Sequence, residues 1–385
     1  MSNLSYMDKL LDGVEVEWKT LGEVFTMRAG RHISASQIME ESDLNYTYPC
    51  FGGNGVRGFV DNQSHDGSHL IIGRQGALCG NVQRVKGEFY ATEHAVVVTA
   101  KDDVNIDWGF HMLTLMNLNQ YASKSAQPGL VVGKIAMIKI PIPPLNIQTK
   151  IVRILDAFTE LTAELTAELV ARKRQYTYYR DQLLTFNDDE VEMKLLGEVG
   201  AVRMCKRVLK SQTSDSEGIP FYKIGTFGKE PNAYITRELF DEYKTKYSYP
   251  QIGEVLISAS GTIGRTVIFD GRDAYFQDSN IVWIENNESK VLNKYLFYFY
   301  QVVNWNVAEG GTIKRLYNDN LRKIKIPIPP LIEQQRIVTI LDKFDALTTS
   351  LTEGLPREIA LRQQQYEYYR ELLLSFPKTE VADND

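Results

Sequence analysis

One phrase that occurs twice constrains this chain more than any other feature of its sequence. Residues 139–145 read Lys-Ile-Pro-Ile-Pro-Pro-Leu, and residues 325–331, 186 positions later, read the same. Further on, residues 175–186 match residues 365–376 once four residues are inserted in the second copy. Four residues make about one turn of an α-helix, so a helix can accept them with its buried face nearly restored. The repeat therefore predicts one long helix in each half of the chain.

The spacing of apolar residues supports the same prediction. Proline is tolerated only at or before the first turn of a helix, so each helix should begin after the paired prolines. Apolar residues then recur at steps of three and four, which is typical of a coiled-coil seam. A pair of unrelated core helices would not explain why both copies carry the same seam. The seam residues are Ile151, Leu155, Phe158, Leu161, Leu165, Leu169, Tyr176, Tyr179 and Leu183, and then Ile337, Leu341, Phe344, Leu347, Leu351, Leu355, Tyr366, Tyr369 and Leu373.

The second helical copy contains two residues that disfavour a continuous helix. Gly354 and Pro356 lie inside its apolar pattern, and proline lacks the N–H that an intrahelical hydrogen bond needs. We expect a break near residues 354–356, with a new helix beginning close to Pro356.

The segments between these helices show a different pattern. Short apolar runs alternate with glycine and polar residues, which is typical of mixed α/β domains with many short strands. Residues 70–82 can be aligned with 255–267, and 90–97 with 275–282, both at an offset of 185. Apolar positions are kept in these alignments, while polar identities differ. This is the pattern expected of two recognition modules that share a framework and bind different ligands.

The start of the chain also resembles its middle. Residues 15–24 and 190–199 share most of their sequence, so both domains are entered alike and a pseudo-twofold internal repeat is predicted. The expected fold class is α+β, with two mixed α/β domains separated by two long antiparallel coiled-coil helices. The expected division is a first domain with a short N-terminal helix at 1–144, a helix at 145–187, a second domain at 188–330, a second helical region at 331–376 and a disordered tail at 377–385.

Composition narrows the class of protein. Apolar residues make up 43% of the 385 residues and charged residues 24%, as in ordinary soluble proteins. No apolar run is long enough to span a bilayer, and the N-terminus lacks a signal-peptide pattern. Three widely spaced cysteines favour a reducing cytoplasm over a disulfide framework or a zinc site. The net charge of −6 is a weak argument against nucleic acid, because local patches determine phosphate contact.

The catalytic motifs that the sequence resembles are incomplete or lie in the wrong context. Residues 53–58 fit the spacing G-x-G-x-x-G, but a dinucleotide site needs a helix next, so a glycine-rich loop or hairpin is the preferred interpretation. Residues 192–194 have the form Glu-x-Lys found in nucleases but lack a preceding Pro-Asp. No nucleophile elbow and no H-E-x-x-H motif is present. The chain is therefore predicted to be non-catalytic.

Recognition is the better prediction for the two variable segments. They combine basic side chains with amides among glycines and aromatics, which suits phosphate positioning together with base-edge readout. Any single cation is most simply interpreted as a solvated surface charge, and only the clustering of several favours a role in DNA binding. The candidate DNA-binding residues are Arg28, Arg31, Arg57, Arg74, Gln75, Asn81 and His94 in the first segment, and Arg203, Lys206, Arg207, Lys223, Arg265, Ser279, Lys314 and Arg315 in the second. Glu93 and His94 align with Asp278 and Ser279, as at a specificity position.

The order of these parts resembles the specificity subunit of type I restriction–modification systems over essentially the whole chain. The Pro-Ile-Pro-Pro phrases, the glutamines that follow them and the Tyr-x-Tyr-Tyr-Arg endings carry the resemblance. The tandem Leu-Thr-Ala-Glu tetrads at residues 161–169 look like the spacer repeat of the type IC subgroup.

The resemblance implies two target-recognition domains, each reading half of a bipartite, asymmetric site on double-stranded DNA. It also implies that the helices bind two methyltransferase subunits, which recruit the restriction subunits. S-adenosylmethionine, ATP and magnesium would belong to those partners and not to this chain. The partner-binding candidates, taken as exposed matches between the helices, are Gln148, Arg180, Gln334 and Arg370.

The sequence leaves one other class of function open and disfavours another. A non-catalytic adaptor with two protein-binding modules on a coiled-coil spacer is compatible with the repeat. An enzyme with its own methyltransferase centre is disfavoured, because no Asn-Pro-Pro-Tyr-type motif and no S-adenosylmethionine motif occur.

Overall fold

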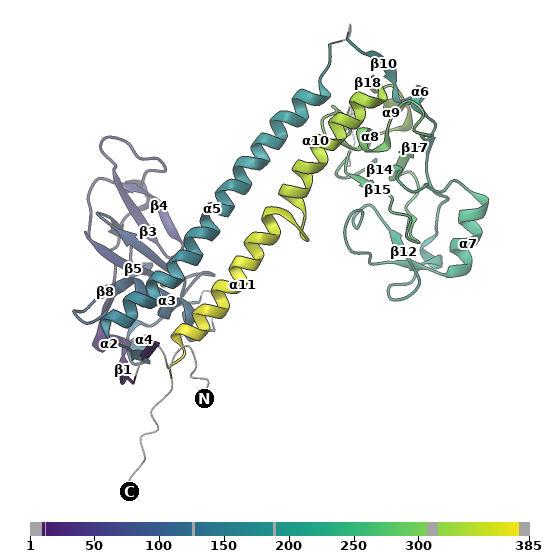
Figure 1. Ribbon diagram of the computed structural model, residues 1–385. Coiled ribbons are helices and arrows are strands. Elements are labelled where there is room, and N and C mark those ends of the chain that lie inside the picture. Colours follow the sequence, from purple (N-terminus) through teal and green to yellow (C-terminus); the bar gives the residue numbers. More distant parts are fainter. Residues whose placement is uncertain (1–9, 12, 125–127, 188–189, 306–314, 377–385) are drawn as a thin grey trace. The chain divides into compact units, whose positions relative to one another are not determined.

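The computed structural model describes residues 10–11, 13–124, 128–187, 190–305 and 315–376 (Figure 1). The chain divides into two compact units, one formed by residues 1–166 with 358–385 and the other by residues 167–357. Each unit therefore contains one α/β domain together with parts of the long helices. The predicted tail at 377–385 lies outside the described residues, as does most of the predicted N-terminal helix.

The domain of the first unit is built from two small sheets. An antiparallel four-stranded sheet has the order β2-β8-β5-β6, and a three-stranded sheet has the order β4-β3-β7, in which β3 and β7 are parallel. The strands are β2 (Phe25–Ala29), β3 (Tyr48–Gly52), β4 (Gly55–Val60), β5 (Ser68–Gly73), β6 (Val82–Lys86), β7 (Tyr90–Ala91) and β8 (Ala95–Ala100), with helices α2 (Leu21–Val24), α3 (Ile106–Leu115) and α4 (Val132–Ala136). Residues 53–54 form the turn of a hairpin and residues 55–58 begin its second strand, β4, so the predicted hairpin is confirmed and no helix follows it.

The domain of the second unit repeats this plan. Its sheets have the orders β11-β17-β14-β15 and β13-β12-β16, and β12 and β16 are again parallel. The strands are β11 (Val202–Arg203), β12 (Ile219–Tyr222), β13 (Tyr234–Ile235), β14 (Val255–Ser258), β15 (Thr266–Ile268), β16 (Tyr275–Phe276) and β17 (Ile281–Ile284). The helices are α6 (Leu196–Val199), α7 (Arg237–Lys246), α8 (Asn293–Phe299) and α9 (Asn318–Arg322).

The repeated phrase is a strand followed by a helix. In the first unit β9 (Lys139–Ile142) pairs antiparallel with β1 (Glu17–Thr20), and in the second β18 (Lys325–Ile328) pairs antiparallel with β10 (Glu192–Leu195). Both are two-stranded ribbons, and such edge positions tolerate proline because one side of the strand needs no ladder hydrogen bond. The ribbon fixes where each long helix starts.

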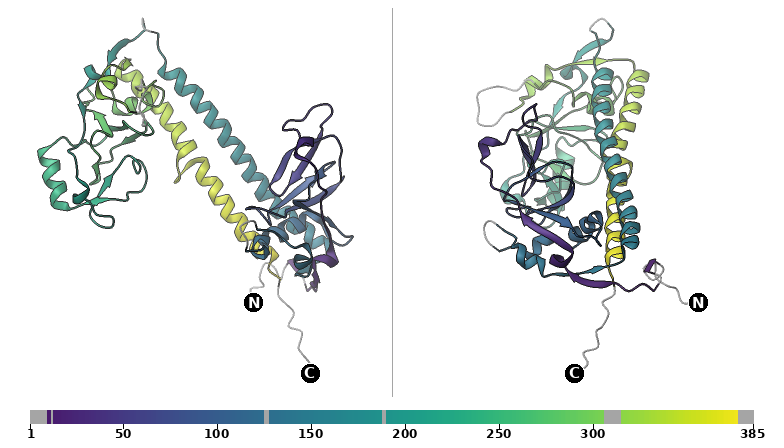
Figure 2. Two further views of the ribbon diagram at one scale, coloured as in Figure 1. Left: turned by 180° about the vertical axis from the view of Figure 1, so that it is seen from behind. Right: turned by 90° about the vertical axis from the view of Figure 1, so that its left-hand side faces the viewer.

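The long helices pack as predicted within each unit. α5 (Leu145–Leu184) is a single helix, whereas the second copy is divided into α10 (Leu331–Thr349) and α11 (Gly354–Leu374). In the first unit α11 runs antiparallel to the start of α5 (Figure 2). Phe158 of α5 stacks there on Tyr369 of α11. In the second unit the end of α5 packs on the start of α10, where Tyr179 stacks on Phe344.

The interruption of the second copy has a local cause. Gly354 has a φ of +79°, and a Cβ there would lie 2.4 Å from the carbonyl oxygen of Ala346, in the last turns of α10. Ser350 holds the gap, since its hydroxyl accepts hydrogen bonds from the amides of Thr352 and Glu353. The prediction that Leu351 belongs to the seam is wrong, because it lies in this gap and is 81% exposed.

Candidate functional site

Three loops meet at one end of the first domain. They join β3 to β4, β5 to β6, and β7 to β8. Gly53 is their point of contact, because a Cβ there would lie 2.8 Å from the carbonyl oxygen of Gln75 and 3.1 Å from that of His94. The loops enclose a cleft of about 340 Å³ whose lining residues are Gly53, Asn54, Arg57, Gln75, Gly76 and His94. Three of the predicted DNA-binding residues are thus brought together.

Polar contacts link the side chains around this cleft. His94 Nδ1 lies 2.6 Å from Gln75 Oε1, and Arg74 donates a hydrogen bond to the carbonyl oxygen of Glu93. Glu93 Oε1 lies 3.0 Å from His32 Nδ1 and 3.4 Å from His94 Nε2. Partial burial would raise the pKa of Glu93, but the bonds from His32 and the backbone outweigh it and hold the pKa below its usual value. Glu93 is therefore anionic at neutral pH.

The second domain forms the same arrangement from different residues. The Ser260 hydroxyl donates to Asn280 Oδ1 at 3.0 Å, and Arg315 donates to the carbonyl oxygen of Ser279. Arg207 forms an ion pair with Asp278 at 3.3 Å. The adjoining cleft of about 410 Å³ is lined by Met204, Ser279, Arg315, Leu316, Tyr317, Asn318, Asp319 and Arg322.

Backbone hydrogen bonds establish which residues correspond between the domains. The amide of Arg74 bonds to the carbonyl of His94, and the amide of Ala259 bonds to the carbonyl of Asn280. His94 therefore corresponds to Asn280, and the predicted match with Ser279 is wrong by one position. The second domain has one more residue in this loop, accommodated by Ser279 in a left-handed conformation with φ of +53°.

The loop between β5 and β6 differs in the opposite way, because the corresponding loop of the second domain, between β14 and β15, is one residue shorter. Gly73 bonds to the carbonyl of Asn81, and Ser258 bonds to that of Arg265, so Asn81 corresponds to Arg265. Arg265 also donates to the carbonyl of Phe227 and is half-buried, while Asn81 is exposed.

The remaining candidates lie around these loops and not in the clefts. Arg28 is exposed on edge strand β2, and Arg203, on the corresponding strand β11, is paired with Glu285. Lys206 lies over the ring of Tyr247. Arg31 is exposed and its backbone bridges to that of Thr92. Lys223 is half-buried just after β12, and Lys314 lies outside the described residues. Sequence reasoning missed His32 and Ser260, because only the fold reveals their contacts.

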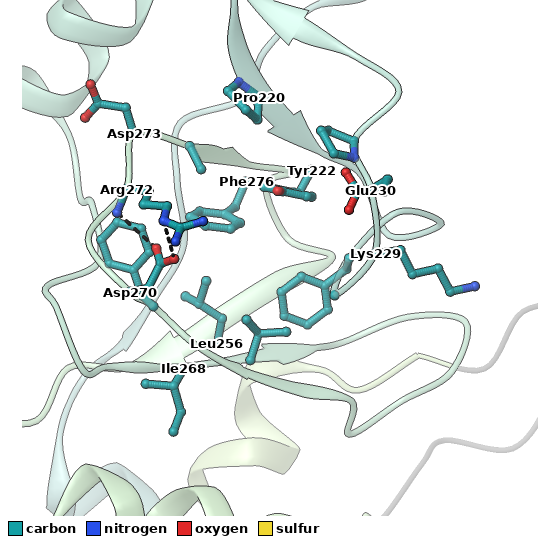
Figure 3. A pocket seen from close by; sticks show the side chains of 16 residues that line it. Pro220, Tyr222, Lys229, Glu230, Leu256, Ile268, Asp270, Arg272, Asp273 and Phe276 are labelled. Carbon is teal, nitrogen blue, oxygen red and sulfur yellow. Dashed lines mark hydrogen bonds and ion pairs between the residues drawn. The ribbon is translucent and has the colours of Figure 1, made fainter. Parts of the chain in front are cut away.

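A separate pocket of about 450 Å³ lies in the second domain (Figure 3). Leu256, Ile268 and Phe276 form part of its apolar wall, and the paired Asp270 and Arg272 stand at its edge. Ala274 lines it at the position where the first domain has the fully buried Phe89. The pocket therefore reflects a difference in how the two cores are filled.

The predicted exposure of Gln148 and Gln334 is wrong. Both are fully buried, and each amide joins a domain to its helix. Gln148 Oε1 accepts from the Asn105 amide, and its Nε2 donates to the carbonyls of Asp103 and Pro143. Gln334 makes the corresponding bonds to Leu292, Lys290 and Pro329. A side chain enclosed in this way cannot contact a partner surface.

The arginines of the helix endings are half-buried. Arg180 lies over the ring of Tyr176 and pairs with Asp181, and Arg370 lies over the ring of Tyr366. The same endings expose two tyrosines at matching positions, Tyr178 (62%) and Tyr368 (63%), which sequence reasoning did not select.

Metal sites and membrane-spanning helices are two further classes of feature. No group of three or more His, Cys, Asp or Glu residues in the described part of the chain is placed to hold a metal ion. Across those same residues, no helix is both long and apolar enough to cross a membrane. All three cysteines are buried and unpaired, and burial raises the pKa of their thiols, to about 12 for Cys205.

Comparisons with known proteins agree on one family. Residues 13–171 and 188–361 match the type I restriction modification DNA specificity domain. A putative type I restriction enzyme specificity subunit from Haemophilus influenzae is 52% identical, over 97% of this chain and 99% of that protein. The EcoR124I/EcoR124II specificity subunit from Escherichia coli is 36% identical over the full length of both.

A solved structure shares the fold. The S subunit of a type I restriction–modification system from M. genitalium superposes with a TM-score of 0.61 at 14% identity, over 98% of this chain and 99% of that one. With the family match and the two relatives, this leads to one conclusion: the chain belongs to the type I restriction–modification specificity subunits, and it is the non-catalytic DNA specificity subunit of such a complex.

Proposed function

We propose that the two domains, residues 1–144 and 188–330, each read one half of a bipartite, asymmetric site on double-stranded DNA. The observation that carries this proposal is the pair of corresponding loop faces. Both are assembled on the same framework, yet the linked side chains are Gln75 and His94 in one and Ser260 and Asn280 in the other. A shared framework with different donors and acceptors is what two readers of different sequences need.

The chemistry of the faces divides into positioning and readout. Cationic side chains such as Arg31, Arg57 and Lys223 suit contacts with phosphate, which fix the register of a protein on DNA without reading sequence. Amides such as Gln75 and Asn280 suit base edges in the major groove. Arg74 and Arg315 each bond to a carbonyl of the recognition loop, so we assign them to holding that loop in place.

We further propose that the helix endings bind two methyltransferase subunits, through which restriction subunits join the complex. The exposed Tyr178 and Tyr368, next to Arg180 and Arg370, have the composition of protein interface hot spots. S-adenosylmethionine, ATP and magnesium are assigned to those partners. The three unpaired cysteines fit action in the reducing cytoplasm.

Exchange of one domain tests whether each domain reads its own half-site. Residues 15–138 would be replaced by those of another specificity subunit with a known target, and the methylated motif would be read by methylome sequencing of cells carrying the operon. One half of the motif should change and the other half should stay.

A change in both halves, or in neither, would contradict the two-module proposal. Binding of the assembled complex to duplex DNA should also weaken steeply with salt, because phosphate contacts release counterions. An adaptor for protein ligands would produce neither result.

A further inference from the structure

The contact between Gln75 and His94 fixes an orientation that an isolated side-chain amide does not have. An amide presents a carbonyl oxygen on one side and an amino group on the other, and it can turn over with little change in shape. Here the oxygen of Gln75 faces His94 Nδ1 at 2.6 Å, and in this orientation Nδ1 is the donor and the amide oxygen the acceptor. The amino group of Gln75 is therefore turned away from His94.

The other ring nitrogen of His94 places a second requirement on its protonation. Nε2 faces the Glu93 carboxylate at 3.4 Å, and an ionised carboxylate can only accept hydrogen bonds. The contact is favourable only if Nε2 carries a proton as well. The other Glu93 oxygen, Oε2, is buried and has no hydrogen-bond partner among the described residues, so this carboxylate is under-satisfied. A His94 ring with protons on both nitrogens satisfies both contacts at once.

Loss of one proton from His94 reverses the amide. The remaining proton belongs on Nε2, facing Glu93, because a lone pair there would oppose the carboxylate. Nδ1 then becomes an acceptor, and Gln75 must turn over to offer its amino group. The carbonyl oxygen of Gln75 is then directed away from His94.

The second domain contains the same link without a titrating group. Ser260 and Asn280 correspond to Gln75 and His94, and the Ser260 hydroxyl donates to Asn280 Oδ1 at 3.0 Å. Neither a hydroxyl nor an amide changes charge between pH 5 and 9. The carboxylate beside this link, Asp278, is paired with Arg207, which stays charged over the same range.

We propose that Gln75 reads a base edge in the first half-site and that the protonation state of His94 determines which end of the Gln75 amide faces the DNA. This inference rests on the proposed function. With His94 charged, Gln75 offers N–H groups to acceptors such as guanine O6 or purine N7. With His94 neutral, it offers a carbonyl to the amino groups of adenine or cytosine. Gln75 is a specificity residue and His94 a positioning residue.

The surroundings of His94 define what else can contribute to a pH effect. Glu93 faces Nε2, and His32 contacts the same carboxylate from the loop after β2. Arg74 bonds to the backbone of Glu93, and Arg57 lines the same cleft. The arginines stay charged at all relevant pH values. The contribution of His32 to a pH effect must therefore be separated from that of His94 by experiment. The charge of Arg31 stays constant.

The test measures base preference at two pH values. The specificity subunit would be assembled with its methyltransferase subunits, and its motif determined by methylome sequencing. Competition binding would then use duplexes carrying each of the four bases at every position of the motif, at about pH 6 and about pH 8.5, on either side of histidine titration. At one position of the first half-site, relative preference should change by roughly 5- to 100-fold, the range of one direct base contact. Preferences in the second half-site should not change.

Matched variants identify the residues responsible. His94→Asn removes the titrating ring, so the pH effect should disappear and one base preference should hold at both pH values. His32→Gln should keep the pH effect, because His32 does not contact Gln75. Gln75→Ala should abolish discrimination at that one position, and Ser260→Ala should alter the second half-site only. Discrimination at the second half-site reports that each variant is folded and assembled.

The outcomes separate the two levels of the proposal. A pH effect that survives in His94→Asn, that appears equally in both half-sites, or that is absent from the unmodified complex overturns the inference and leaves DNA reading intact. A complex with no sequence preference at any pH would overturn the proposed function itself.

Discussion

Arg180 and Arg370 show how a residue can be matched in sequence and still be half-hidden in the fold. Each guanidinium lies over a tyrosine of its own helix, the preceding turn supplying Tyr176 or Tyr366. The Arg180 side chain is only 19% exposed. A cation held against an aromatic ring contributes to stability as well as to any interface.

Charge reversal at these arginines should therefore reduce co-purification with the methyltransferase subunits. Arg180→Glu and Arg370→Glu would be compared with Tyr178→Ala and Tyr368→Ala, which remove exposed rings and should lower methyltransferase binding without affecting the fold. Pull-down with tagged methyltransferase measures binding, and thermal unfolding of the free subunit measures stability. Full assembly in all four variants would contradict the assignment of the helix endings to partner binding.

Residue-scale prediction from sequence failed where a polar side chain could be either buried or exposed. Gln148 and Gln334 are matched and polar, and each lies four residues after the paired prolines, so the sequence suggests an exposed position. Burial depends on backbone groups of residues some 40 positions away, and no local pattern records that contact. Similarly, no pattern in the sequence around Ser260 predicts its hydrogen bond to Asn280.

At the scale of elements, helix α3 is attached to α5 by a histidine. His111 is fully buried, its Nε2 lies 2.8 Å from Asp156, and Tyr366 of α11 contacts its Nδ1. Burial, assisted by Arg84, lowers the pKa of His111 to about 4 despite the neighbouring carboxylate. The ring is therefore neutral at physiological pH, with its proton on Nε2 toward Asp156.

Acid should loosen this junction. The unfolded chain takes up the proton near pH 6.5 and the folded chain only near 4, so stability is complete above about pH 6.5 and is lost as the pH falls toward 4. The difference amounts to roughly 3 kcal/mol. Hydrogen-exchange protection of α3, corrected for intrinsic rates, should drop between pH 7 and pH 5.

The second unit provides an internal control for this effect. Helix α8 is held to Asp342 of α10 by Tyr298 and Lys294, and neither changes charge between pH 5 and 7. Protection of α8 should stay constant over that interval. His111→Gln, which keeps a donor toward Asp156, should make α3 equally insensitive. Equal loss of protection in both helices would show that His111 is not the cause.

Elements were predictable to the extent that periodicity defined them. The long helices, the break in the second copy and the mixed α/β character of both domains follow from apolar spacing and from Gly354 and Pro356. The loop alignments did not follow, because an insertion between β16 and β17 and a deletion between β14 and β15 leave the apolar pattern almost unchanged. Only the hydrogen-bonded register reveals such shifts.

At the scale of the whole molecule, the tetrads of α5 offer a way to change the distance between the half-sites. Leu161, Leu165 and Leu169 are half-buried along one side of a continuous helix, and the alanines and glutamates between them are exposed. Inserting Thr-Ala-Glu-Leu after Leu169 adds about 6 Å and turns the helix by about 400°, so the seam nearly regains its register.

Base pairs in B-DNA are spaced by about 3.4 Å. The tetrad insertion should keep both half-site sequences and lengthen the unread spacer by one or two base pairs, as seen in the methylated motif. A two-residue insertion is the matched control, since it rotates the seam by about 200° and should impair assembly. An unchanged spacer in the tetrad variant would show that α5 does not set this distance.

The buried glutamines have a consequence for how such a molecule can evolve. Every hydrogen bond made by the amides of Gln148 and Gln334 ends on a main-chain atom. The proline partner is shared, but the domain residues that accept or donate differ between the two units, for example Asn105 in one and Leu292 in the other. The attachment therefore depends on the position of the backbone and not on the identity of the side chains. Selection can therefore preserve one glutamine and one proline phrase while the domain beyond them drifts, and a lineage can acquire a new target without redesigning the connection.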